Sequence, residues 1–185
     1  MDALEAILTR HSISKVKSDP VDRKIIDKLL HAAVQAPNHH MLRPWRFVVL
    51  TGKSRAALGD VMAQELKKRS PEVPEAGLEK ERAKPLRAPV LVAVGVHKLA
   101  DPRVPEIENI CAVAAAIENL LLAAHAEGLG AMWRTGQAAR DPEVKKFLGF
   151  EPDQELLGFV YIGYPDLELP VAQRPSYEDR TVWME

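Results

Sequence analysis

Cysteine and net charge are both scarce in this sequence. Cys111 is the single cysteine among 185 residues, so no internal disulfide can form, and we expect it to be a small core residue. The formal net charge of −1 provides no field that would recruit nucleic acid or an anionic membrane. The first five residues lack the basic-then-apolar order of a signal peptide. We therefore expect a cytoplasmic protein that binds neither nucleic acid nor membrane.

Motifs for several common chemistries are also absent. The sequence has no nucleophile elbow, P-loop, zinc-ligand spacing or paired acids, and Gly128-Leu129-Gly130 lacks the third glycine of a dinucleotide fingerprint. His39 and His40 have no cysteine or carboxylate at ligand spacing, so we expect no metal site. What remains are cationic, hydroxyl and aromatic residues at the ends of predicted elements, which suit an anionic, planar ligand better than acid–base chemistry.

Residues 108–136 form the segment around which the chain is organised. Its first part, residues 108–127, is rich in alanine and leucine. This stretch contains no proline and predicts a helix of about five turns that is apolar on every face. Glu118, Asn119 and His125 interrupt the apolar run, which argues against a transmembrane span. The chain's own sheet can cover one face of this helix, and a second copy of the helix can cover the other. We therefore predict a homodimer with this helix at its interface.

The remaining patterns predict one α+β domain over residues 1–185, with a mostly antiparallel sheet flanked by helices. Apolar runs predict strands at residues 45–50, 89–96 and 156–163, a further strand around Trp133, and amphipathic helices that include residues 53–69.

Several local signals refine this outline. Asp2 opens a capping box for a first helix, and Ser18-Asp19-Pro20 is typical of the start of a second. Residues 75–84 are highly charged and predict either a mobile lid or a solvated excursion. The tail ends in apolar residues that include Tyr177 and Trp183, so we expect it to dock on something.

The stretch from Arg10 to Lys15 places cationic and hydroxyl side chains at the end of the first predicted helix. An arginine fork and serine hydroxyls are well suited to a phosphate group. A solvated helix terminus, where the helix dipole favours cations, explains the same residues. The residues alone leave both interpretations open.

Motifs along nearly the whole chain resemble the flavin-dependent nitroreductase family. They are Arg10-His11-Ser12, Ala36-Pro37, Pro44-Trp45-Arg46-Phe47, Ala88-Pro89, Gly128-Leu129-Gly130 and the tail from Arg174-Pro175 to Trp183. Trp133-Arg134-Thr135-Gly136 is similar to a short, compact branch of that family. The resemblance implies a nitroreductase-like fold and a homodimer that binds two FMN molecules at its interface, each held by residues of both chains.

The resemblance also implies roles for particular residues. Arg10 and Ser12 would bind the phosphate and ribityl end of FMN, with His11 between them and Arg174 as a further phosphate ligand. Gln35 and His39 would reach the same FMN from the other subunit. The isoalloxazine would be lined by Trp133, Arg134 and Thr135, with a backbone N–H of Thr135 or Gly136 directed at N5. The nicotinamide nucleotide would contact Ala123, Ala124, His125, Ala126, Glu127 and Gly128.

Two residues depart from the pattern of larger family members. Met41 stands where those members have asparagine, and Arg43 stands where they usually have glutamine. The missing amide removes a polar contact near the flavin, so His39 must take more of that role. Lys15 is a candidate for the cation near flavin N1 and O2.

The implied activity is ping-pong hydride transfer from NAD(P)H to FMN N5 and on to nitroaromatic, quinone or related acceptors, with no catalytic side chain required. A dehalogenating, enone-reducing or flavin-fragmenting enzyme of the same fold is the first alternative. A flavin-binding module without turnover and a ligand-free helical dimerisation protein are the others. The sequence does not distinguish NADH from NADPH or identify the physiological acceptor.

Overall fold

The computed structural model describes residues 1–97, 103–167 and 174–185. Four strands form one sheet in the order β1-β2-β4-β3, namely β1 (Trp45–Thr51), β2 (Val90–Val96), β4 (Leu156–Gly163) and β3 (Gly130–Arg134). All three strand pairs are antiparallel. Every residue of β2 is buried, because this strand is covered on both faces of the sheet. The predicted strands are therefore confirmed, with β2 and β4 in the centre.

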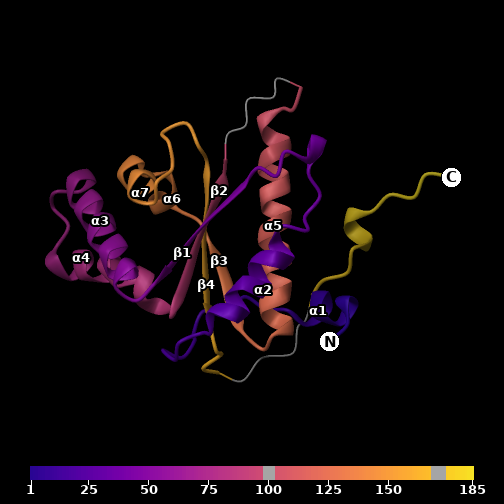
Figure 1. Ribbon diagram of the computed structural model, residues 1–185, viewed down its shortest axis with the longest axis horizontal. Coiled ribbons are helices and arrows are strands. Elements are labelled where there is room, and N and C mark those ends of the chain that lie inside the picture. The colour runs from indigo at the N-terminus through magenta and orange to yellow at the C-terminus, as the bar shows by residue number, and fades with distance from the viewer. Residues whose placement is uncertain (98–102, 168–173) are drawn as a thin grey trace.

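Helices form a layer on each face of the sheet (Figure 1). One layer contains α2 (Arg23–Ala33) and α5 (Glu106–Ala126), and the other contains α3 (Lys53–Arg69), α4 (Glu75–Arg82), α6 (Gln137–Arg140) and α7 (Pro142–Phe147). Side chains alternate between the two cores along the strands, so Val92 packs with the α5 layer and Leu91 with the α3 layer. The predicted α+β class is confirmed.

Helix α5 confirms the predicted central helix. Its inward residues Val113, Ile117 and Leu120 are fully buried against the sheet, as in a core helix, although α5 is long and apolar enough to cross a membrane. Its outward side carries Ile107, which is 61% exposed, and Cys111, which is also exposed. The prediction that Cys111 is a core residue is therefore wrong within one chain, because the helical repeat turns it away from the sheet.

The first two helices differ in how well their starts were predicted. In α1 (Ala3–Thr9), Asp2 caps the helix by accepting a hydrogen bond from the backbone N–H of Glu5 at 2.8 Å, as expected. Helix α2 begins at Arg23 rather than near Ser18, so that prediction is wrong. Asp22 is the cap, because its carboxylate accepts from the Lys24 N–H at 2.8 Å.

The charged segment at residues 75–84 forms α4 and the first residue of η2 (Lys84–Arg87), and α4 packs on α3. Leu78 is buried, and Gly59 of α3 lies so close that a Cβ there would sit 2.2 Å from the Arg82 carbonyl oxygen. Arg82 also pairs with Asp60 of α3 at 3.0 Å. This segment is therefore a packed helix and not a solvated excursion, and its role as a mobile lid stays a prediction.

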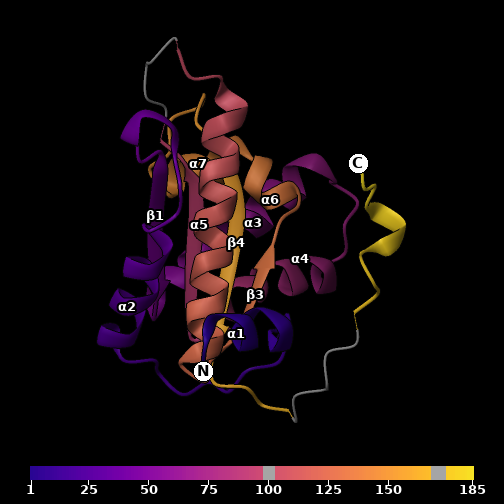
Figure 2. The same cartoon turned by 90° about the vertical axis from the view of Figure 1, so that its right-hand side faces the viewer.

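The end of the tail extends away from the helical layers (Figure 2). Its short η3 turn (Glu178–Arg180) is exposed, and so are Tyr177 and Trp183, the latter at 80%. Within the described residues, no surface covers the apolar end of the tail, so the expected docking does not occur inside one chain. These apolar residues remain available to another molecule.

Candidate functional site

The segment after α1 lies against the edge strand β3. The Ile13 N–H donates to the Ala131 carbonyl oxygen at 3.0 Å, and Ser12 forms a parallel bridge with Ala131. Three residues farther along, β3 ends at Arg134 and leads into the Thr135 turn. The structure thus places two motifs that are distant in the sequence on the same edge of the sheet.

Arg10 is held from two other parts of the chain. Its Nε donates to Glu118 Oε1 of α5 at 3.1 Å, and its carbonyl oxygen accepts from Arg174 Nη2 at 2.7 Å. The structure therefore brings Arg174 next to Arg10. The His11 Nε2 atom is buried and has no hydrogen-bond partner among the described residues. Two arginines, a serine and an unpaired imidazole nitrogen form a donor set suited to a phosphate ester.

The stretch predicted to contact NAD(P)H occupies the last turn of α5 and the turn that follows. Here His125 Nε2 lies 2.8 Å from Thr9 Oγ1, which joins this stretch to α1. Burial and the nearby charges of Arg10 and His11 lower the pKa of His125. Ala124 is fully buried, so its side chain offers no surface to a nucleotide. The nucleotide site as a whole stays a prediction.

A cavity of about 400 Å³ adjoins the end of β3 and is lined by Arg134, Thr135 and Gly136. Gly136 has a φ of 126°, a backbone conformation that favours glycine. The Arg134 guanidinium lies 5.9 Å from the centre of the Tyr161 ring, and burial raises the pKa of Tyr161. Trp133 does not line this cavity, because successive side chains of a strand point to opposite faces. Its Nε1 donates to the Leu157 carbonyl oxygen at 3.1 Å.

The cavity beside Arg134 is strongly cationic, which the sequence analysis did not foresee. It is bordered by Arg69, Lys84, Arg87 and Arg134. Arg69 pairs with Asp141, and Lys84 pairs with Glu81. Arg87 and Arg134 have no ion pair within the described ranges. The available signal was the position of Lys84 and Arg87 directly before a predicted central strand, where they lie close to an edge of the sheet.

Lys15, considered for the flavin N1 and O2 region, occupies a different place. Its Nζ lies 3.2 Å from Asp166 Oδ2, and its side chain is largely exposed. It does not line the cavity beside Arg134. Arg87 and Arg134 line that cavity instead.

Gln35 and His39 lie away from this edge. Gln35 follows α2, and its Nε2 donates to the His31 carbonyl oxygen of that helix. His39 lies in η1 (His39–Met41), and its Nδ1 is 3.0 Å from Glu108 Oε2. Glu108 and His125 stand at opposite ends of α5, and their seventeen-residue separation corresponds to about 25 Å. Within one chain, His39 therefore cannot hold the same end of a ligand as Arg10.

The loop around His39 is strained. His40, Met41 and Arg43 have φ values of 47°, 54° and 51°, which non-glycine residues seldom adopt. Asn38 supports the loop by accepting from the Arg43 N–H at 2.8 Å. Such strain is common at ligand sites. Nothing in the sequence pattern distinguished this loop from an ordinary connection.

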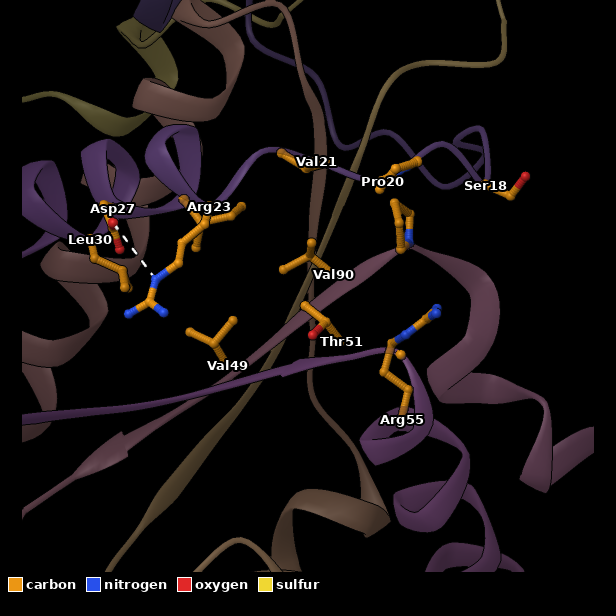
Figure 3. A pocket seen from close by; sticks show the side chains of 13 residues that line it. Ser18, Pro20, Val21, Arg23, Asp27, Leu30, Val49, Thr51, Arg55 and Val90 are labelled. Atoms are coloured by element: carbon orange, nitrogen blue, oxygen red, sulfur yellow. Dashed lines mark ion pairs between the residues drawn. The ribbon is translucent and has the colours of Figure 1, made fainter.

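A larger cavity of about 700 Å³ lies at the opposite edge of the sheet, between α2, β1 and the start of α3 (Figure 3). Val49 and Val90 contribute apolar surface, and Arg23 and Arg55 add cationic groups. It contains none of the residues predicted to bind a ligand. Size alone therefore does not identify the functional site, and we assign the candidate site to the β3 edge.

Both the sequence and the fold match a known family. The profile of the Nitroreductase family matches residues 7–164. This chain belongs to the nitroreductase family. One relative, from Escherichia coli strain K12, bears the provisional name NAD(P)H nitroreductase YdjA and is 29% identical over 168 residues, which cover 91% of each chain.

Solved structures show the same nitroreductase fold. A nitroreductase-like family protein from Bacillus cereus superimposes with a TM-score of 0.83 at 25% identity, covering 100% of this chain and 97% of that one. The FMN and NADPH-dependent nitroreductase NfnB from Sphigopyxis sp. strain HMH superimposes with a TM-score of 0.79 over 100% of both chains. The two sequences are 19% identical, so this similarity is evidence for the fold alone. The predicted nitroreductase-like fold is confirmed.

Proposed function

We propose that this nitroreductase-family chain is an FMN-dependent NAD(P)H oxidoreductase that acts as a homodimer, with one flavin at each of two seams between subunits. The observation that carries this proposal is the division of the site residues between the two ends of α5. A twofold axis through the outward faces of two α5 helices would bring the His39 end of one chain beside the Arg10 end of the other. Exposed Ile107 and Cys111 would then be covered.

The residues at the β3 edge fit FMN. Arg10, Arg174 and the Ser12 hydroxyl would hold the phosphate and ribityl end, and Arg134 and Arg87 would place positive charge near the ring. Bound FMN supplies hydride transfer between NAD(P)H and an organic acceptor such as a nitroaromatic compound or a quinone. The protein's part is to orient the ligands and to exclude water. The chain's membership of the nitroreductase family supports the same cofactor.

The absorbance spectrum of the freshly purified protein tests this proposal. We expect flavin bands that bleach when NADH or NADPH is added without oxygen and return when an acceptor is supplied. A colourless protein that does not take up added FMN contradicts the proposal. A yellow protein that neither nucleotide bleaches points instead to a flavin-binding module without turnover.

A second candidate function keeps the flavin but changes the acceptor. Met41 and Arg43 depart from the larger family members and lie in the strained loop, which favours an acceptor other than the nitro compounds those members reduce. Turnover of alkenes or halophenols at a higher kcat/KM than nitro compounds would support this candidate. We also propose that residues 1–185 form one domain, since both hydrophobic cores share one sheet. We propose further that this domain is cytoplasmic, a reducing setting that suits its single cysteine.

A further inference from the structure

Three contacts fasten the short segment formed by Thr9 and Arg10 to distant parts of the fold. Two come from α5, where Glu118 accepts from Arg10 Nε at 3.1 Å and His125 lies 2.8 Å from the Thr9 hydroxyl. The third is the hydrogen bond from Arg174 to the Arg10 carbonyl oxygen. The segment that carries the predicted phosphate ligand is thus tied to the central helix and to the tail.

The direction of the Thr9 contact follows from the hydroxyl's other partner. The Thr9 hydroxyl donates to the Glu5 carbonyl oxygen at 2.6 Å, so its only proton is used. It therefore accepts from His125, whose Nε2 carries the hydrogen. This contact fixes the backbone just before Arg10 and leaves the Arg10 side chain to be oriented by Glu118.

The contact with Glu118 occupies one edge of the Arg10 guanidinium. The carboxylate takes Nε, whereas the two terminal nitrogens have no partner in the described parts of the chain. The Arg10 side chain is only 16% exposed, so its position is well defined, and Glu118 is 48% exposed. A fixed guanidinium with two free terminal nitrogens is already oriented to bind a phosphate.

We infer that Glu118 is a positioning residue, which holds the Arg10 guanidinium in the orientation that binds the flavin phosphate. This inference rests on the proposed function. Glu118 has two opposing effects: it orders a long side chain in advance, but its negative charge repels the phosphate. Because Glu118 is half exposed, solvent weakens the repulsion, whereas the ordering does not depend on charge. Ordering should therefore be the stronger effect.

Substitutions at position 118 separate the two effects. Glu118→Gln keeps an acceptor for Arg10 Nε without the charge, and Glu118→Asp keeps the charge but is one methylene too short to reach. Titration of the apo-protein with FMN, followed by flavin fluorescence, should show affinity within about threefold of wild type for Gln and a loss of about five- to tenfold for Asp and for Glu118→Ala. Riboflavin, which lacks the phosphate, should bind all variants equally.

Glu106→Ala, a substitution in the first turn of the same helix, is the matched control and should change neither affinity. Circular dichroism and sedimentation establish that each variant keeps the wild-type fold and assembly. Tighter FMN binding by both Gln and Ala variants would mean that repulsion dominates, which overturns the inference. Equal losses for FMN and riboflavin would mean a general structural role and overturn it as well. If wild-type protein binds neither flavin, the proposed function itself is wrong.

Discussion

The two ends of α5 differ in how completely one chain builds them. At its C-terminal end, α1, the tail and α5 meet in a network that includes Arg10, Glu118, His125 and Arg174. At its N-terminal end, the loop containing His39 is strained, and beside it lies an open, mostly apolar hollow of about 360 Å³ that includes Cys111. One end is thus assembled by contacts within one chain, although His11 Nε2 stays unpaired there. The other end presents an apolar surface that still lacks contacts.

Under the proposed function, the two ends are the two halves of one site. The Arg10 end has donors for an anionic group, whereas the His39 end has a strained loop beside an apolar hollow. Because the ends are about 25 Å apart on one helix, only a second chain can bring them together. The substitutions below either alter one half of this site or separate the two subunits.

The largest effect is expected from a charge on the outward side of α5. Cys111→Asp should leave the single chain folded, because this residue is exposed there, but would bury an unpaired carboxylate in the dimer. Such burial costs about 3 kcal/mol or more for each subunit, so we expect dissociation and loss of bound flavin. Sedimentation at micromolar concentration measures the first effect and flavin absorbance the second. Cys111→Ser is the control. A Cys111→Asp variant that stays dimeric and yellow would refute this interface.

The next largest effect should come from the Arg10 end. Arg10→Ala removes a charge-assisted contact to phosphate, worth about 1.5–3 kcal/mol, so FMN affinity should fall by roughly ten- to a hundredfold. Fluorescence titration measures this change. Lys15→Ala, which removes a nearby cation paired with Asp166, should have little effect. Unchanged affinity in the Arg10 variant would exclude Arg10 from the site.

A smaller effect is expected at the other end. His39→Ala removes one hydrogen-bonding group, worth about 0.5–1.5 kcal/mol, so FMN should bind about two- to tenfold more weakly. His40→Asn is the control, because asparagine tolerates the left-handed backbone at that position. Equal losses of affinity for riboflavin and FMN would place His39 at the ring or ribityl part of the flavin. A loss confined to FMN would place His39 at the phosphate instead.

The smallest effect concerns pH. The pKa of His125 is lower in the folded protein than in the unfolded chain, mainly because of burial, so the folded state binds fewer protons between the two values. The free energy of unfolding should therefore rise with pH through this window and fall as the pH drops below about 6.5. His125→Asn should flatten this dependence in urea titrations between pH 5 and 7. An unaltered slope for His125→Asn would contradict the assignment.

Sequence reasoning located the elements whose signals are local. The composition of α5 predicts a helix in any context, and the apolar run of β2 predicts a strand covered on both faces. The start of α2 was misplaced because Ser18 and Asp22 are both good caps, and only packing decides between them. Cys111 was assigned to the core because an apolar helix face looks the same whether a sheet or another subunit covers it.

The site was less predictable than the fold. The resemblance named Arg10, Arg134 and Arg174, but the Arg10–Glu118 pair joins residues 108 positions apart, and no local pattern carries such information. The cations Lys84 and Arg87 looked like ordinary surface charge until the fold placed them beside the end of β3.

Analytical ultracentrifugation of the yellow protein, recorded at the protein and flavin absorbance bands together, tests the shared site most directly. We predict that flavin sediments only with the dimer, at one FMN per chain, and that dilution into monomer releases it. A monomer that sediments with its flavin would contradict the account.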